Sequence, residues 1–414
     1  MFKPKWMLTL VLPPGFFPPA NAPGALLRFK GVRPATVLTA AGEMVLHRRY
    51  FWGKGAGGRY PSDERAGIAS GTVSPGAREV CCVMAMASDF RSASVNLARV
   101  GGLRICRERL RQIVEREAMQ ITAARDAGLL PAEGFGAALE KSRMYLGVDG
   151  LFVRTVTDQE KNKRRKSHAM RRRQRGKAGI DNLKPLPPVR AGTDQTFKEV
   201  KFALFYDQSK QHRHGLATAG DAAEAGRLLR LHAAAVGLDK ARHKIGLTDG
   251  APWIKRQLGL NLPMLTKHLL DFYHLAQHVH EAARVCLGEG SPEAETWAQA
   301  RLDEARRAGP TTLLGQIDVL NKTLRAAAKR QAAGRLRGYV SERMDMLNYP
   351  SARRKGWDIG SGPTEAAGKA MALRVRGVGM KWDLDHAADM MNLKALYNSN
   401  QSKAWWSRAA GCLN

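Results

Sequence analysis

The sequence predicts an α/β protein whose sheet is interrupted by an all-helical block. Strand-like patterns occupy residues 144–156, 197–208 and 243–254. Residues 293–345 then have apolar side chains at helical spacing, and a last helix is expected from about Pro363. Strands, followed by a long helical block and one more helix, indicate a single sheet with an all-α insertion before its last helix.

The charge of the chain limits its partners. The 414 residues include 67 Lys and Arg but only 37 Asp and Glu, which gives a net charge of +30. A hydrophobic content of 44% excludes a wholly disordered chain. So large a positive excess opposes a compact fold by self-repulsion, and it indicates a polyanionic partner such as a phosphodiester backbone.

The cysteines and the N-terminal residues indicate the cellular compartment in which the protein is expected. The five cysteines form no CxxC pair, so we expect neither a disulfide framework nor a cysteine zinc site, in keeping with a reducing cytoplasm. The first residues resemble a signal peptide, but Pro13 and Pro14 interrupt their apolar stretch. No other apolar segment is nearly long enough to span a membrane. We therefore expect a cytoplasmic protein without a membrane partner.

Residues 88–117 are typical of a helix, a tight Gly101-Gly102 turn and a second helix. Phe90, Leu97 and Val100 give the first helix an apolar face. This layout predicts a helix-turn-helix whose basic second helix enters the DNA major groove. An ordinary helical hairpin with a solvated basic face is the alternative. The arginines expected to contact DNA are Arg104, Arg107, Arg109 and Arg111.

A second basic region follows the first strand. Ten of the seventeen residues in 161–177 are Lys or Arg. We expect a solvated basic loop over 158–192, which binds phosphates without reading sequence. The expected phosphate contacts are Arg164, Arg165, Lys166, Arg171, Arg172 and Arg173.

Three acidic residues stand out beside glycines. Asp149 lies within a strand in "GVDG", and Asp249 ends another strand in "TDGAPW". A strand aspartate is costly to bury unless something pairs with it, although Asp249 also suits an ordinary Asp-Gly turn. Glu365 in "WDIGSGPTEAAGK" suits the first turn of a helix after Pro363, where an acid favours the helix dipole. It is also a candidate third ligand of a metal site.

Three carboxylates match the needs of phosphoryl chemistry. Two Mg²⁺ ions, for which Mn²⁺ can substitute, accept one or two carboxylates each and leave room for water and phosphate oxygens. Such a pair activates an attacking hydroxyl and stabilises the leaving oxygen. Because the sequence offers no competing nucleophile arrangement, Asp149, Asp249 and Glu365 are the predicted catalytic and metal-binding residues.

Four segments in order, "GVDG", "TDGAPWI", "DFYH" and "GSGPTEAAGK…GVGMKW", resemble bacterial insertion-sequence transposases of the Mutator-like superfamily, which have an RNase H-like DDE core. The similarity extends over about residues 36–398. It implies Asp149 on the first core strand, Asp249 after the fourth strand and Glu365 on the last core helix. It also implies a nucleoid-associated homodimer or higher oligomer that acts on double-stranded DNA, at terminal inverted repeats and at target DNA.

Three more residues are candidates near this site. Asp271 and His274 match the Asp-x-x-His signature of the superfamily. His274 and His278 share helical spacing, but no third zinc-ligand pattern follows, so we expect His274 to orient a carboxylate or a DNA phosphate. Lys369 lies one turn after Glu365 and either touches the scissile phosphate or forms a simple ion pair with Glu365.

The full fold prediction is an RNase H-like core with an all-α insertion and an N-terminal helix-turn-helix region. The predicted segments are a poorly ordered leader (1–35), a β-rich module (36–75), the helix-turn-helix region (76–140), the first part of the core (141–275), the helical insertion (276–350), the last part of the core (351–400) and a tail (401–414).

Three functions follow from these features. The first is a transposase that cleaves and transfers DNA strands at a DDE site. The second is an RNase H-like structure-selective nuclease of the resolvase type, which hydrolyses without joining. The third is a catalytically inactive, basic DNA-binding transposon remnant.

Overall fold

The computed structural model describes residues 27–68, 72–130, 132, 135, 142–174, 176, 194–399 and 401–409. The chain divides into two compact units. The first unit comprises Met1–Pro131 with Asn392–Asn414, and the second comprises Ala132–Met391.

The first unit begins with an antiparallel sheet. Strands β1 (Arg28–Thr39) and β2 (Gly42–Gly53) form a hairpin, and the short β3 (Gly57–Arg59) pairs with β2. These strands supply the β structure of the segment 36–75 that was predicted to be β-rich. β1 begins inside the segment 1–35 predicted as a leader, because its pairing with β2 extends to Arg28. The residues before 27 lie outside the described part of the chain.

Helices complete the first unit. They are α1 (Pro61–Arg65), α2 (Pro75–Ala87), α3 (Phe90–Val100), α4 (Arg107–Asp126), residues 392–398 at the end of α14 (Leu384–Asn398), and α15 (Ser402–Ala409). The last of these lies in the segment predicted as a tail. The indole of Trp405 on α15 donates a hydrogen bond of 2.8 Å to Glu117 on α4, which fixes α15 against the helices of this unit.

The α3–α4 pair departs from the expected geometry. The connection runs over residues 101–106, whereas a helix-turn-helix usually has a turn of about three to four residues. Val100, predicted to face the core, is exposed, because the helix ends there and the chain reverses through Gly101. Leu97 on α3 and Leu110 on α4 are buried as expected.

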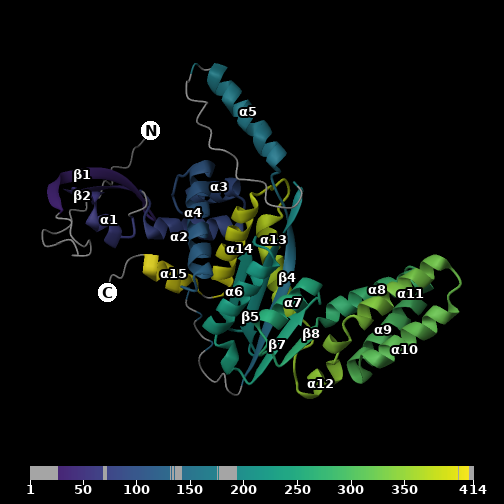
Figure 1. Ribbon diagram of the computed structural model, residues 1–414. Helices are drawn as coiled ribbons and strands as arrows, with labels where there is room; N and C mark the ends of the chain where they lie inside the picture. Colours follow the sequence, from purple (N-terminus) through teal and green to yellow (C-terminus); the bar gives the residue numbers. More distant parts are fainter. Residues whose placement is uncertain are drawn as a thin grey trace. The chain divides into compact units, whose positions relative to one another are not determined.

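The second unit contains a five-stranded mixed sheet, so the α/β prediction is confirmed. Its strands are β4 (Arg143–Arg154), β5 (Phe197–Asp207), β6 (Arg213–Thr218), β7 (His243–Thr248) and β8 (Lys267–Leu270), in the order β6-β5-β4-β7-β8. β5 is antiparallel to β4 and β6, whereas β7 and β8 run parallel to β4 (Figure 1).

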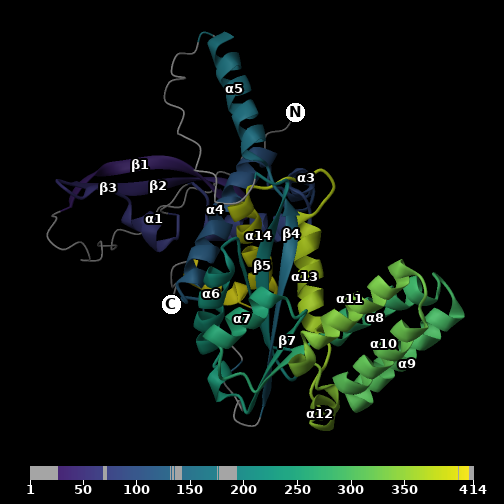
Figure 2. The same cartoon turned by 45° about the vertical axis from the view of Figure 1, so that its right-hand side comes forward.

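Helices cover both faces of this sheet. α6 (Ala222–Ala235) and α7 (Pro252–Asn261) pack on the face that carries Leu146 and Val148. α13 (Gly362–Val375) packs on the opposite face, which carries Tyr145, Leu247 and Tyr206 (Figure 2). α14 (Leu384–Asn398) follows α13 in the chain. Because strand side chains alternate between faces, these two clusters define where every residue of β4 points.

A helical block separates β8 from α13. It contains α8 (Phe272–Leu287), α9 (Pro292–Ala308), α10 (Pro310–Thr323), α11 (Ala327–Ser341) and α12 (Tyr349–Arg354), with the short turn η3 (Met344–Met346) after α11. A second short turn, η2 (Leu238–Lys240), lies outside this block, between α6 and β7. Leu313, Ile317 and Leu336 lie in its shared core. The prediction that residues 293–345 are almost entirely helical is confirmed, and the block begins at Phe272, before the predicted boundary of 276.

The basic segment after β4 is helical at its start, not a loop. Residues Asp158–Gln174 form α5, and residue 175 and residues 177–192 of the predicted loop 158–192 lie outside the described part. Thr157 and Glu160 bond to each other's backbone N–H groups, a capping box that favours helix initiation. Lys, Arg, Met and Ala are also good helix formers, and this outweighs the mutual repulsion of the charges.

In the part of the chain that the structure describes, no helix is both long enough and apolar enough to cross a membrane.

Candidate active site

Asp149 lies on β4, Asp249 directly follows the adjacent parallel strand β7, and the two side chains face the same way. Val148 of β4 pairs with Thr248 at the end of β7, so the two aspartates follow at the same level of the sheet. Tyr145 and Leu247, which precede them by even numbers of residues, belong to the cluster on the α13 face. Both carboxylates therefore lie on that face, at the carboxyl end of β7, where ligand sites of α/β sheets commonly form.

This arrangement raises the free energy of the ionised form of Asp149. Burial, together with the neighbouring charge of Asp249, raises the pKa of Asp149 from its ordinary 3.8 to about 6. The Gly150 N–H donates to its Oδ1 at 2.7 Å and partly offsets these effects. A partly desolvated carboxylate beside a second carboxylate is a common feature of functional sites.

Asp249 belongs to the aspartate pair and also forms the Asp-Gly turn that the sequence predicts. Its Oδ1 accepts a hydrogen bond of 2.9 Å from the Ala251 N–H, just before α7 begins. Gly250 has a left-handed φ of +73°, and a side chain there would meet Arg343 and Leu270. The Asp-Gly pair is therefore a genuine turn, and the same turn directs the aspartate toward Asp149.

The first turn of α8 borders the two aspartates. The charge of His274 on this turn acts on Asp149 and lowers its pKa, which places the imidazole near that carboxylate. The ring of His278, one turn further along, stacks on Tyr339 with the ring centroids 3.9 Å apart. The second histidine thus packs against α11.

Asp271 fixes the turn that leads to Glu365. It is fully buried, its Oδ1 accepts from the Tyr273 N–H at 2.6 Å, and its Oδ2 accepts from the Ser361 N–H at 2.8 Å and from the Ser361 hydroxyl. The backbone N–H of Phe272 donates to the Ile359 carbonyl at 2.9 Å. The start of α8 and the turn before α13 are therefore joined by a buried polar contact.

Glu365 occupies the first turn of α13. The preceding residue, Thr364, lies against Gly147 of β4, where any side chain would clash with it. Glu365 itself is partly exposed and pairs with Lys369 at 3.4 Å, while the Lys369 side chain is 79% exposed. In the described ranges, no three His, Cys, Asp or Glu side chains lie close enough to hold one metal ion. The structure thus brings Asp149 and Asp249 together and leaves Glu365 outside a three-ligand cluster.

Three residues near the aspartates were not identified from the sequence. Tyr339 of α11 donates from its hydroxyl to the Asp249 carbonyl at 3.4 Å, and the Arg343 guanidinium lies over its ring, 4.2 Å from the centroid. The charge of Glu199 on β5 also contributes to the raised pKa of Asp149, and Lys201 pairs with Glu199 at 3.0 Å. Only the helical spacing of Tyr339 and Arg343 was visible in the sequence, and it does not identify the strand end they contact.

The predicted DNA-contacting arginines of the first unit differ in their surroundings. Arg104 and Arg107 are exposed, and Arg104 borders an open hollow with Ser94 of α3. Arg111 pairs with both Glu108 and Glu115 on its own helix, so much of its charge is already compensated. Arg109 lines a small hollow between α2 and α4.

The predicted phosphate contacts of the second unit all fall on α5. The side chains of Arg164, Lys166, Arg171 and Arg173 are exposed, and Arg165 is half-buried. Arg172 lies on the same helix. One helix therefore concentrates these positive charges along its length.

Comparisons with known proteins give little further information. No protein-family model matches the chain, and no curated protein matches it. A structure of the Drosophila P element transposase strand transfer complex is similar to it with a TM-score of 0.30 and 10% sequence identity, over 82% of this chain and 83% of that chain. A TM-score this low does not identify a shared fold, so the functional assignment depends on the residues of the site.

Substitution of Asp271 tests the polar contact before α13. Asp271→Ala is expected to lower the free energy of unfolding by about 3 kcal/mol, because each buried donor left without a partner costs ~1–3 kcal/mol. The matched control is Asp318→Ala, which removes an exposed ion pair with Arg337 and should cost less than about 1 kcal/mol. Urea denaturation measures both. Equal stability of the two variants would show that Asp271 does not fix the turn.

Proposed function

We propose that this chain is a transposase that binds DNA ends and performs Mg²⁺-dependent strand cleavage and strand transfer at Asp149, Asp249 and Glu365. The observation that carries the proposal is the pair formed by Asp149 and Asp249 on one face of the sheet. Burial and mutual repulsion raise the pKa of Asp149 to about 6, and a bound divalent cation would relieve both effects.

The topology supports an RNase H-like interpretation of the second unit. Three antiparallel strands, β4 to β6, precede two parallel strands, with β4 at the centre of the order β6-β5-β4-β7-β8. The first acid lies on the central strand and the second follows the neighbouring parallel strand. This is the placement that the resemblance implies for Asp149 and Asp249.

The donor atoms fit Mg²⁺ in part. Asp149 and Asp249 supply carboxylate oxygens, the ligands that Mg²⁺ prefers, and Mg²⁺ sites usually use only one or two protein carboxylates. Bound Mg²⁺ would supply electrostatic stabilisation of the phosphate and activation of the attacking hydroxyl. Glu365 is proposed as the third carboxylate because Thr364, beside it, packs on β4 next to Asp149.

The residues of the chain itself contribute positioning. His274, near Asp149, is suited to orient that carboxylate or to contact a phosphate oxygen. Arg343 lies against Gly250, the residue after Asp249, and Lys369 pairs with Glu365, so both bring positive charge close to the proposed ligands. Asp271 fixes the turn before α13 through Ser361.

DNA binding is proposed for two basic regions, each considered on its own. In the first unit, α4 and the residues before it carry Arg104, Arg107 and Arg109. In the second unit, α5 carries the longest basic run of the chain. Exposed arginines and lysines of this density bind phosphates with an affinity that falls steeply as salt rises. A homodimer or higher oligomer on DNA is part of the same proposal.

The test uses the purified chain and a labelled duplex that ends in the inverted repeat bordering its own coding region. We expect Mg²⁺- or Mn²⁺-dependent nicking and joining of the labelled end to a plasmid. Asp249→Asn should reduce both by more than the ~10–100-fold that loss of an outer-shell partner costs. Strand transfer by Asp249→Asn at the wild-type rate would contradict the assignment.

Asp239→Asn is the matched control, because Asp239 lies on the short turn η2 and has no part in the proposed site. Its cleavage and joining should match those of the wild type. Cleavage without joining would instead identify a structure-selective nuclease.

One observation favours the alternative of an inactive DNA-binding remnant. Glu365 is paired with Lys369 and belongs to no three-ligand cluster in the described part of the chain. That alternative predicts salt-sensitive DNA binding with no metal-dependent cleavage by the wild-type chain. The same labelled-end assay therefore separates the two.

A further inference from the structure

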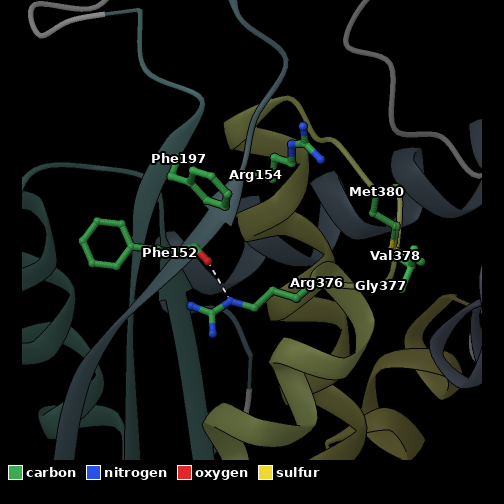
Figure 3. Close-up of a pocket in the computed structure, with 8 residues that line it drawn as sticks. Phe152, Arg154, Phe197, Arg376, Gly377, Val378 and Met380 are labelled. Carbon is green, nitrogen blue, oxygen red and sulfur yellow. Dashed lines mark hydrogen bonds between the residues drawn. The ribbon is translucent and has the colours of Figure 1, made fainter.

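A hollow of about 390 Å³ lies beyond the aspartates, at the far end of β4 (Figure 3). It is lined by Phe152, Arg154, Phe197, Arg376 and the segment 377–380. All of these residues belong to the second unit. The hollow therefore forms within one compact part of the chain.

The walls of the hollow are held together by hydrogen bonds to backbone carbonyls of β4. β7 ends at Thr248, so beyond Val148 that edge of β4 is open to another segment, and the residues after α13 occupy it. The Arg376 Nε donates to the Phe152 carbonyl at 2.7 Å, and the Trp382 N–H donates to the Arg154 carbonyl at 3.0 Å. These bonds fix the segment 376–382 against β4 and leave the hollow between them.

The lining combines aromatic rings with positive charge. Phe152 and Phe197 are more than half exposed, which is unusual for aromatic side chains on a sheet. The side chains of Arg154 and Arg376 are also exposed, and the lining contains no acidic residue. Exposed aromatic rings beside arginines are the combination that binds unpaired nucleotides, by stacking on the base and contact with the phosphate.

The size of the hollow suits such a ligand. Small-ligand sites usually enclose about 300–1,000 Å³, and this hollow lies at the lower end of that range. It can admit a base with its sugar but not a duplex. An unpaired strand is therefore the form of DNA that fits.

The rim of the hollow continues into the basic helix α5. Glu160 in the first turn of α5 pairs with Lys381, and Lys161 pairs with Asp383 at 3.1 Å. The segment that walls the hollow is thus tied to the start of the helix that carries the basic run. A strand bound in the hollow would meet further positive charge along α5, as electrostatic complementarity to a polyanion requires.

We propose that this hollow binds an unpaired nucleotide of a DNA strand, with the base against Phe152 and Phe197 and the phosphates against Arg154 and Arg376. This inference rests on the proposed function and adds to it a preference for unpaired DNA. Phe152 is three residues along β4 from Asp149, a backbone separation of about 10 Å. Because three is an odd number of residues along a strand, the side chains of Phe152 and Asp149 lie on opposite faces of the sheet. The hollow is therefore a separate site from the aspartates.

The test measures fluorescence anisotropy with a labelled single strand of about 16 nucleotides, long enough for one site, and with the matching duplex. Phe152→Ala and Phe197→Ala are each expected to weaken single-strand binding about 5- to 150-fold, the fold-change that corresponds to ~1–3 kcal/mol per stacked base. Duplex binding should change less than about twofold. Leu260→Ala, which removes another exposed apolar side chain on α7, is the matched control and should change neither.

Two further measurements test the proposed contacts of the base and of the phosphate separately. A 2-aminopurine base in the single strand should lose fluorescence on binding to the wild type and keep it with Phe197→Ala. Arg154→Gln should reduce the salt dependence of single-strand binding by about 0.7 in the log–log slope, the value for one phosphate contact. If an alanine variant fails to fold, Phe152→Leu and Phe197→Leu replace it, because leucine keeps the apolar volume but has no aromatic ring. These variants should also weaken single-strand binding if the rings stack on a base.

The outcomes separate this inference from the proposed function. If the wild type binds neither single strand nor duplex, the proposed function fails. If it binds both but the phenylalanine variants leave single-strand affinity and 2-aminopurine fluorescence unchanged, the hollow is not a nucleotide site, while the proposed function stands. A polyglutamate peptide that binds as tightly as the oligonucleotide, and loses binding in the same variants, would assign the hollow to an acidic peptide instead.

Discussion

Asp149→Asn is expected to abolish strand cleavage and, in the absence of divalent metal, to raise the free energy of unfolding at pH 7.5. The gain should be about 1–3 kcal/mol, because the raised pKa of Asp149 means that its charge is costly in the folded state. The amide keeps an oxygen to accept the Gly150 N–H bond and carries no charge. Urea denaturation in EDTA measures the gain.

The raised pKa of Asp149 also determines how the stability of the protein changes with pH. In the unfolded chain Asp149 releases its proton near its ordinary pKa of 3.8, whereas in the folded chain it holds the proton to about pH 6. The folded state therefore binds more protons between these values, and the contribution of Asp149 to stability falls as pH rises through that window. In Asp149→Asn this fall should be absent.

Millimolar Mg²⁺ gives the complementary measurement. A cation that binds only the folded state stabilises it by mass action, so Mg²⁺ should raise the denaturation midpoint of the wild type. It should leave that of Asp149→Asn nearly unchanged. If Asp149→Asn is less stable than the wild type in EDTA and responds equally to Mg²⁺, Asp149 is not a metal ligand.

Asp207→Asn is the control for these measurements. Asp207 is also on the sheet, at the end of β5, but its oxygens accept hydrogen bonds from Ser209 at 2.6 Å and from the His212 N–H at 3.2 Å. Its substitution removes favourable contacts and should destabilise the protein. The two aspartates are thus expected to change stability in opposite directions.

The sequence contained enough to predict the sheet and the two aspartates. Alternating and apolar runs identified β4, β5 and β7, and the glycines beside Asp149 and Asp249 identified strand positions where a carboxylate is unusual. β6 was missed, because "RHGLAT" buries His214 and Gly215 and lacks the apolar alternation of a strand. α5 was missed because its composition resembles a linker, although Thr157 and Glu160 already had the spacing of a capping box.

The contacts that shape the site could not be read from local patterns. Asp271 and Ser361 are 90 residues apart in the chain, as are Asp249 and Tyr339. Which helix of the insertion contacts which strand end depends on how α8 and α11 pack together, and periodicity shows only that each helix has an apolar face. The same holds for Glu365, whose neighbour Thr364 packs on Gly147 across the sheet.

Glu365→Gln is expected to abolish metal-dependent cleavage with little effect on folding. Its carboxylate favours the helix dipole by about 0.3–1 kcal/mol, and its exposed pair with Lys369 contributes about 0–1 kcal/mol. The loss of stability should therefore stay near 1 kcal/mol, whereas the loss of a metal ligand should remove activity. Urea denaturation and the labelled-end assay measure the two effects separately.

Glu224→Gln offers a closely matched comparison. Glu224 also lies in the first turn of its helix and pairs with a basic residue on the same helix, Arg227, at 2.8 Å. It belongs to α6, which covers the opposite face of the sheet from α13. Its substitution should cost a similar amount of stability and leave cleavage at the wild-type rate.

The comparison decides between the two roles that the turn before α13 allows for its acid. If Glu365→Gln and Glu224→Gln lose equal stability but only the first loses cleavage, the carboxylate acts in the chemistry, and α13 must bring it toward Asp149 and Asp249 when DNA and metal are bound. If both variants keep cleavage, Glu365 serves its helix alone. Asp149 and Asp249 would then be the only carboxylates of the proposed set at the site, which is the arrangement seen in the free chain.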